Sequence, residues 1–600
     1  MVCRCLLVAS LLLLSAVGAD SAELPLIPMP QRVEPLSGSF DVSRDTKLLI
    51  GDPRAEAAAR YFGDLLFQAR GFRPETVQST ASQPPKKTML FTLDADAAAA
   101  SPEGYDLEIT SKSIRLAASD PRGLMYGAVT LWQLLTSNPG KDDQISLTAM
   151  RIKDAPRLQW RGLLLDSARN YQTVEFIKHF IDTMAVHKLN LLHWHLVDDQ
   201  AWRLEIRRFP KLTEARSNQP ASIYTQNQVR EIVEHAAQRN VTIIPGLEMP
   251  GRATAALLAY PQFGAGASAS SRADAANLYG VEEPTFGFFD GVLTEIAELF
   301  PGPFVHIGGT DVSKDQWRNS PTVQARMRQL GIANEQRLQR YFLERISAML
   351  TQRSRRLVGW DGALSGGLAS NSVITTGKGI DGALVAAASG YDVIVSSYAG
   401  LNLDRRQASA VPGQSISDSL VSLEDIYAFD PIPEALSDQE RSRMIGIQAN
   451  IWTNATDTEE QVETMTFPRG AAVAEVAWSP PARGRWSSFL RRMAPQLSRY
   501  ASLGIRYSDA AFRVMVIPRG MMSQDRVRIE LAKQTPLGEI RYTVNGAELT
   551  PRSNAYEDVF EVTMPAVVKA TTYLNGVPLA PAVTMQVDRT SVAQLPTLTD

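Results

Sequence analysis

Acidic and aromatic side chains recur directly after short apolar segments in the middle of this chain. The residues at or shortly after these eight segment ends are Asp166, Asp198, Asp199, Glu248, Thr310, Asp311, Trp360, Asp361, Gly377 and Trp452, with Asp404 in the loop after the seventh segment. Tryptophan faces stack on the apolar C–H face of a pyranose ring, and carboxylates bind its hydroxyls. Gathered in one place, such residues indicate a carbohydrate site.

Each of these residues also has a purely structural interpretation. An Asp at a strand end can cap the next helix, and Trp360 and Trp452 can be core aromatics. His193 and His195 lie on the same side of one predicted strand and could bind a metal. A third ligand at matching spacing is missing from the sequence, so packing inside the fold is favoured. We therefore expect no metal and no organic cofactor.

The segments themselves predict the scaffold. The apolar segments are 160–165, 189–196, 241–245, 304–307, 357–360, 373–376, 392–395 and 445–449. Helical patterns separate and follow them at 173–188, 227–239, 288–300, 334–352, 380–389, 459–477 and 487–503. Strand–helix alternation of this kind over residues 155–503 predicts a (β/α)8 TIM barrel, with a doubly wound open sheet as the alternative. Active sites of such barrels lie at the C-terminal ends of the strands, where the residues above fall.

The length of 600 residues predicts two to four domains. Residues 23–152 combine a Pro-rich start, two helical stretches and alternating strands, which predicts an N-terminal α/β domain. Residues 505–590 contain only short strands and turns, which predicts a C-terminal β-sandwich.

The N-terminus predicts export. Arg4 precedes an apolar run from Leu6 to Leu14, and small residues follow up to Ala19, so residues 1–19 are predicted to be a signal peptide. A membrane anchor is the alternative, but the run is short for a bilayer span. Both cysteines, Cys3 and Cys5, fall in this segment, so a disulfide-free mature chain is expected in a bacterial periplasm or outside the cell. The net charge of −3 and the lack of a Lys/Arg run disfavour nucleic-acid binding.

Four longer motifs resemble those of one enzyme family. They are RGLLLDSAR at 161–169, LHWHLVDDQ at 192–200, HIGG at 306–309 with Trp317 and NSP at 319–321, and the segment from Phe467-Pro468-Arg469 to Trp478-Ser479-Pro480. The chain resembles glycoside hydrolase family 20, the β-N-acetylhexosaminidases. The resemblance covers nearly the whole mature chain and implies the N-terminal α/β domain and a C-terminal sandwich like that of bacterial chitobiases.

The resemblance implies substrate-assisted chemistry, in which the acetamido oxygen of the substrate attacks the anomeric carbon. An Asp orients that acetamido group, and the adjacent Glu protonates the leaving oxygen. Thr310 and Asp311 stand at these two positions. A hydroxyl cannot supply the negative charge of the orienting Asp, and Asp311 is one methylene shorter than Glu.

Other expected sugar-binding positions also differ from the family pattern. Arg252 replaces His, Glu248 an Asp, Gly377 a Trp, Asn402 a Tyr and Asn454 a Glu. The residues that match the family are Arg161, Asp198, Trp360, Asp404 and Trp452.

Three functions stay open on this basis, all with a glycan as substrate or ligand. The first is hydrolysis of terminal β-linked N-acetylhexosamine at reduced efficiency, with Asp311 as the acid. The second is a glycosidase for a sugar that lacks the acetamido group or carries an acid, which Arg252 could bind. The third is a sugar-binding protein that has lost catalysis.

Overall fold

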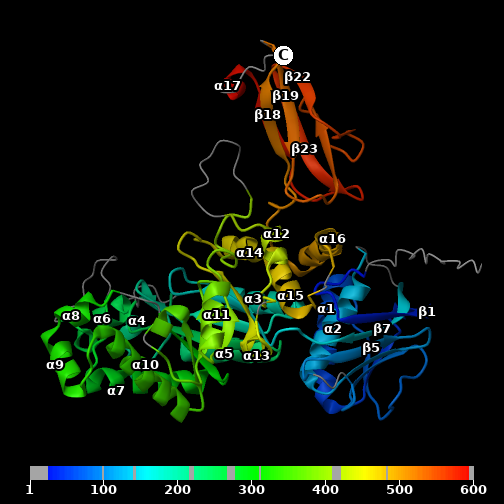
Figure 1. Cartoon of the computed structure of the whole chain (residues 1–600). Coiled ribbons are helices and arrows are strands. Elements are labelled where there is room, and N and C mark those ends of the chain that lie inside the picture. The colour runs from blue at the N-terminus through cyan, green and yellow to red at the C-terminus, as the bar shows by residue number, and fades with distance from the viewer. Residues whose placement is uncertain are drawn as a thin grey trace, which may run out of the picture.

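A computed structural model gives the protein's structure and describes residues 24–97, 101–138, 144–214, 222–266, 277–309, 313–365, 367–408, 420–434, 436–481, 484–523 and 525–593. Its centre is a closed barrel of parallel strands (Figure 1). The strands are β8 (Trp160–Asp166), β9 (Leu191–His195), β12 (Thr242–Met249), β13 (Phe304–Gly308), β14 (Arg356–Trp360), β15 (Val373–Thr376), β16 (Asp392–Val395) and β17 (Met444–Ile451). All eight overlap the predicted strands. Pairing of β9 with β12 and of β17 with β8 closes the ring, so the barrel is confirmed and the open sheet is excluded.

Side chains fill the barrel interior in layers, as expected for this fold. Trp160, Ile244, Val358, Val373 and Ile394 form one apolar cluster inside it. Polar side chains also fill the interior, and the rings of two buried histidines stack with their centroids 4.2 Å apart. These histidines are His193 and His306. His193 thus packs inside the barrel.

Helices cover the outside of the barrel. They include α3 (Val174–Val186), α5 (Gln226–Ala237), α7 (Glu283–Leu299), α10 (Glu335–Gln352), α11 (Ile380–Ala388), α14 (Glu459–Thr466), α15 (Arg469–Trp478) and α16 (Trp486–Leu503). The other helices of this region are α4 (Lys211–Glu214), α6 (Thr254–Ala259), α8 (Asp315–Asn319), α9 (Pro321–Leu330), α12 (Leu423–Ala428) and α13 (Asp438–Arg443).

The expectation of a single helix over 459–477 is wrong. The chain leaves α14 at Phe467, whose backbone is extended (φ −106°, ψ 142°), and α15 begins after Pro468. Proline disfavours helical backbone at the residue before it and has no N–H to continue the helix, so the break falls there.

The N-terminal domain is a seven-stranded mixed sheet with two helices against it. Its strands are β1 (Arg32–Ser43), β2 (Lys47–Ile50), β3 (Thr76–Gln78), β4 (Thr88–Leu93), β5 (Tyr105–Ile109), β6 (Ile114–Ala118) and β7 (Gln144–Asp154), in the order β1-β7-β5-β6-β4-β2-β3. The helices are α1 (Glu56–Arg70) and α2 (Pro121–Leu135). Nearly every residue of α2 is buried, because the sheet covers one side of it and barrel elements cover the other.

Buried polar contacts join this domain to the N-terminal end of the barrel. The carboxylate of Asp154 in β7 accepts hydrogen bonds from the Trp478 indole at 3.0 Å and from Lys188 at 3.1 Å. Arg161, at the start of β8, forms an ion pair with Glu103 of the N-terminal domain. The far end of the barrel, where the strands finish, is left open to the loops.

The C-terminal residues form two antiparallel sheets that stand apart from the barrel in Figure 1. One holds β18 (Met515–Met521), β19 (Arg526–Ala532) and β22 (Phe560–Thr563). The other holds β20 (Glu539–Thr543), β21 (Asn554–Ala555), β23 (Ala566–Leu574), β24 (Val577–Pro578) and β25 (Val583–Val587), and α17 (Arg589–Val592) follows. The two sheets share an apolar core of their own. No helix in the part of the chain that the structure describes is both long and apolar enough to span a bilayer.

Candidate active site

A cavity of about 290 Å³ lies at the C-terminal ends of the barrel strands. Its walls are formed by Arg169, Asp198, Gln200, Glu248, Arg252, Trp360, Tyr398, Asn402, Trp452 and Asn454. Charged and amide side chains make one part of the wall, and three aromatic rings make another. A cavity of this size and composition suits one sugar ring, whose hydroxyls need polar partners and whose C–H face needs an aromatic surface.

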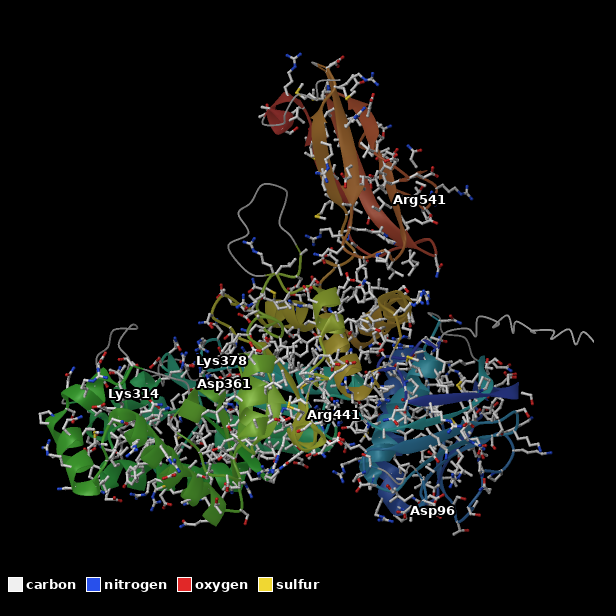
Figure 2. The ribbon with its side chains drawn as sticks, viewed as in Figure 1. Asp96, Lys314, Asp361, Lys378, Arg441 and Arg541 are labelled. Carbon is white, nitrogen blue, oxygen red and sulfur yellow. The ribbon has the colours of Figure 1, made fainter. Side chains whose placement is uncertain are left out.

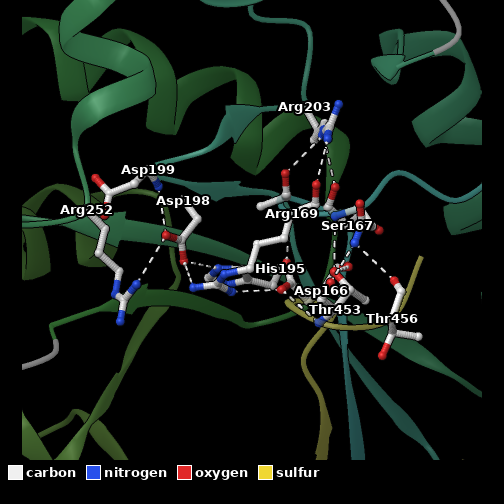
Figure 3. A network of polar contacts seen from close by, with 12 residues as sticks. Asp166, Ser167, Arg169, His195, Asp198, Asp199, Arg203, Arg252, Thr453 and Thr456 are labelled. Atoms are coloured by element: carbon white, nitrogen blue, oxygen red, sulfur yellow. Dashed lines mark hydrogen bonds and ion pairs between the residues drawn. The ribbon is translucent and has the colours of Figure 1, made fainter. Parts of the chain in front are cut away.

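Asp198 is the centre of the polar part (Figure 3). It lies in the short hairpin of β10 (Val197–Asp198) and β11 (Ala201–Trp202) that follows β9. One carboxylate oxygen accepts hydrogen bonds from Arg169 at 2.7 Å and His195 at 3.0 Å, and the other accepts one from Arg252 at 3.3 Å. Burial alone would raise the pKa of Asp198, but these partners lower it well below its usual range. The carboxylate is therefore ionised, with two cations beside it.

Contacts hold both the guanidinium and the backbone of Arg169 in place. Its guanidinium also pairs with Asp166 at the end of β8, at 2.8 Å, and lies 5.2 Å from the centre of the Trp452 ring. Arg203 donates hydrogen bonds to the carbonyl oxygens of Ser167, Ala168 and Arg169 itself, which holds the turn that carries Arg169 (Figure 3). An arginine held in this way presents a preorganised donor to a ligand in the cavity.

Glu248, near the end of β12, is the second carboxylate of the cavity and is almost fully buried. It packs against Gly308, where a Cβ would lie only 2.0 Å from its Oε2 atom, so the glycine at this position makes room for the carboxylate. Burial raises its pKa to about 7, and the charge of Asp198 adds to this effect. Below about pH 7 the two neighbouring carboxyl groups are thus held in opposite protonation states, an arrangement used for acid–base chemistry.

His195, Asp198 and Glu248 offer potential metal-ligand atoms that lie within 4.8 Å of one another. This grouping was not predicted, because strand spacing pairs His195 with His193 and does not show that Asp198 and Glu248 lie beside it. Arg169 and Arg252 both contact Asp198, so a cation bound here would face two fixed positive charges. The cluster is accordingly better suited to hydrogen bonding than to metal binding.

Three aromatic rings form the other part of the wall. Trp360 lies at the end of β14, with its ring centre 6.1 Å from that of Trp452 and 5.8 Å from that of Tyr398. The rings of His306 and Trp360 form an edge-to-face pair with their centres 5.0 Å apart. The loop beside Trp360 is held by Asp361, which accepts a hydrogen bond from the backbone N–H of Lys378 at 2.9 Å (both labelled in Figure 2).

Most of the residues expected to bind sugar line this one cavity. They are Asp198, Glu248, Arg252, Trp360, Asn402, Trp452 and Asn454. Asn402 is held there by Asn450, whose amide donates a hydrogen bond to it at 2.9 Å. Thr310 and Asp311, the expected catalytic pair, lie outside the described residues, which resume at residue 313.

Two expected sugar-binding residues lie elsewhere. Asp404 is not part of the cavity wall; its Oδ1 atom is buried and has no hydrogen-bond partner among the described residues. Arg161 lies at the opposite end of the barrel, fully buried, and its guanidinium binds Glu103 of the N-terminal domain and the carbonyl oxygens of Leu158 and Lys188. The expectation for Arg161 is wrong because it stands at the start of β8, whereas the mouth is formed by residues at or after the C-terminal ends of the strands.

The cavity also contains Arg169, Gln200 and Tyr398, which sequence reasoning did not select. Arg169 and Gln200 close the two motifs that carry the family resemblance, and both follow a strand end. Their position after a strand end could therefore have identified both residues from the sequence. Tyr398 follows β16 but has no counterpart in the motifs, so its role is visible only in three dimensions.

Comparison with known proteins agrees with this geometry. The family described as "Glycosyl hydrolase family 20, catalytic domain" matches residues 158–481, and its "domain 2" matches residues 23–155. The chain belongs to glycosyl hydrolase family 20. The predicted resemblance is confirmed, and with it the prediction of a family 20 glycoside hydrolase.

Other members of family 20 are similar over most of their length. A Beta-hexosaminidase of Porphyromonas gingivalis is 32% identical over 588 residues, which cover 94% of this chain and 74% of the relative. A Beta-hexosaminidase of Vibrio furnissii is 31% identical over 487 residues, which cover 76% of this chain and 77% of that relative. The solved structure of the Vibrio harveyi exo β-N-acetylglucosaminidase in complex with N-acetylglucosamine aligns with a TM-score of 0.72 at 29% identity, over 81% of this chain and 78% of that one.

Proposed function

We propose that this chain is an exported hydrolase that removes terminal β-linked N-acetylhexosamine from glycans by substrate-assisted, retaining chemistry. The observation that carries the proposal is the single cavity in which Asp198, Arg169 and three aromatic rings meet at the barrel mouth of a family 20 chain. The polar residues suit the hydroxyls of a terminal sugar, and the rings suit its apolar parts. The Vibrio harveyi protein, similar over most of this chain, was solved with N-acetylglucosamine bound.

The proposed rate is low, because Thr310 occupies the position of the carboxylate that would orient the acetamido group. In the proposed reaction the acetamido oxygen attacks the anomeric carbon, Asp311 gives a proton to the leaving oxygen, and water then opens the intermediate and returns a proton to Asp311. Loss of one preorganised stabilising group at such a position typically costs about 100-fold or more in kcat. The shorter side chain of Asp311 lowers the rate further.

Hydrolysis of a chromogenic β-N-acetylglucosaminide by the purified chain tests the proposal. Asp311→Asn is the critical variant, and Asp315→Asn is a matched control in the exposed helix α8 that follows. We expect slow turnover that Asp311→Asn abolishes and Asp315→Asn leaves unchanged. Sugar binding without any turnover at high protein concentration would instead support a non-catalytic sugar-binding protein.

One observation favours acidic sugars as a second candidate substrate class. The Arg252 side chain lines the cavity, is 38% exposed and carries a fixed charge. Within the described residues, Asp198 accepts one hydrogen bond from this guanidinium, which leaves donors for a carboxylate or sulfate on the sugar. Turnover of a β-glucuronide by wild type but not by Arg252→Met would support this candidate, and turnover of the N-acetylglucosaminide alone would exclude it.

Export is the third part of the proposal and rests on the predicted signal peptide at residues 1–19. N-terminal sequencing of the chain recovered from the periplasm or medium of an expressing bacterium tests it. We expect Asp20 as the first residue. An intact Met1 on protein found only in the cytoplasm would contradict export.

A further inference from the structure

Tyr398 forms one part of the cavity wall, and Gly377 lies directly against its ring. Gly377 directly follows β15, and its missing side chain leaves a space that the Tyr398 ring fills. A Cβ atom at residue 377 would lie 2.2 Å from Cζ and 2.6 Å from the hydroxyl oxygen of Tyr398. A larger side chain at 377 and the present position of Tyr398 are therefore mutually exclusive.

The backbone holds Tyr398 in this place. Its N–H donates a hydrogen bond of 2.9 Å to the carbonyl oxygen of Gly377, which ties the loop after β16 to the loop after β15. Its ring contacts Trp360, and the residue, which is 37% exposed, lines the cavity. Burial and the nearby carboxylates of Asp361 and Glu248 raise the pKa of the phenol, so the hydroxyl keeps its proton at neutral pH.

The Trp360 ring has neighbours in Trp452 and Tyr398, whose ring centres lie 6.1 and 5.8 Å from its own. Asp198, Arg169 and Arg252 line the cavity beside them. A ligand with both hydroxyls and a small apolar group would direct the hydroxyls to the charged residues and the apolar group to the rings. The methyl of an N-acetyl substituent is such a group.

We propose that Tyr398 is a specificity-determining residue that takes the wall position opened by Gly377 and packs against the N-acetyl group of the bound sugar. This inference deepens the proposed function, since it requires an N-acetylhexosamine to enter the cavity. It concerns binding alone and holds whether or not the sugar is then hydrolysed.

Calorimetric titration of the full mature chain with N-acetylglucosamine and with glucose tests the proposal. The variants are Tyr398→Ala, Tyr398→Phe, Gly377→Trp and the double variant, with Phe67→Ala as a control for an exposed aromatic residue on α1. We expect Tyr398→Ala to weaken binding of N-acetylglucosamine about fivefold or more, and to leave the weaker binding of glucose unchanged. Tyr398→Phe and Phe67→Ala should bind like wild type.

Gly377→Trp supplies an independent test, because the new ring collides with Tyr398. We expect this variant to lose affinity and the added Tyr398→Ala substitution to restore it. Equal binding by wild type and Tyr398→Ala would overturn the inference, as would a double variant no better than Gly377→Trp. A wild-type chain that binds no N-acetylglucosamine would overturn it too, whereas binding without turnover contradicts only the proposed hydrolysis.

Discussion

Asp198 and Glu248 show how neighbouring residues of one type are given different chemistry. Asp198 has three side-chain partners, His195, Arg169 and Arg252, and is held as a carboxylate. Glu248 has no hydrogen-bond partner among the described residues, and its burial favours the protonated form up to a pH of about 7. Removal of the Asp198 charge should therefore break ion pairs, whereas removal of the Glu248 carboxyl should change the pH dependence of stability.

Glu248→Gln should flatten the pH dependence of stability. The pKa of Glu248 is about 7 in the folded chain against an ordinary value of 4.5, so the folded state holds the proton more tightly. Its contribution to stability is thus fully present below about pH 4.5 and is lost as the pH rises through about 7. We expect the melting temperature of wild type to fall between pH 5 and 8, and that of Glu248→Gln to fall less.

His195 also has a raised pKa and acts in the same direction, so the slope should shrink rather than vanish. Glu75→Gln is a matched control at an exposed site, with 64% of its side chain accessible, and should follow wild type. An identical slope in wild type and Glu248→Gln would show that the buried carboxyl does not titrate in this range.

Asp198→Asn should destabilise the fold strongly. It leaves the buried Arg169 guanidinium without one of its two carboxylate partners, and breaking a buried pair from one side costs about 3–5 kcal/mol. Asp64→Asn, which loses only the exposed pair with Arg73, should cost less than about 1 kcal/mol. Urea unfolding of both variants measures the difference, and equal losses would refute the central role of Asp198.

At the scale of elements, close approach between strands limits which residues the barrel accepts. Gly446 in β17 pairs with Trp160 in β8, and a Cβ there would lie 2.1 Å from the Trp160 carbonyl oxygen. We expect Gly446→Ala to cost about 3 kcal/mol or more, since backbone cannot move aside cheaply.

Gly287→Ala is the matched control for this substitution. It lies inside α7 with open space around its Cα, so alanine should be neutral or stabilise by up to about 1 kcal/mol. The denaturant midpoints of the two variants measure the difference in stability between them. A Gly446→Ala chain as stable as Gly287→Ala would show that β8 and β17 separate easily.

Strands and long helices were predictable from this sequence because apolar segments of fixed length alternate with periodic helical patterns. The break at Phe467-Pro468 was missed because the apolar pattern continues across it, although Pro468 marks it. Most of the selected residues at strand ends do line the cavity, since topology alone brings them together, but Asp404, further along the loop after β16, does not. Tyr398 also follows a strand end, but its role could not be predicted, because it depends on the space left by Gly377.

At the scale of the whole molecule, the two ends of the barrel have different tasks. The N-terminal domain seals the end at which the strands begin, through Glu103–Arg161 and the contacts of Asp154. The ends at which the strands finish carry the cavity. Arg161 therefore belongs to the domain interface, and stability and sugar binding should respond to different substitutions.

Glu103→Gln tests this separation. Loss of the Glu103 charge leaves the fully buried Arg161 uncompensated, and we expect a loss of about 3–5 kcal/mol in unfolding free energy. The dissociation constant for N-acetylglucosamine should stay within twofold of wild type. Weakened sugar binding at unchanged stability would return Arg161 to the sugar site.

The stereochemistry of the released sugar tests the proposed function most directly. Proton NMR of a β-N-acetylglucosaminide mixed with the purified chain distinguishes the anomer formed first from the one formed later by mutarotation. Substrate-assisted chemistry predicts that β-N-acetylglucosamine appears first, with retention of configuration. First appearance of the α-anomer, or no released sugar at all, would contradict the account.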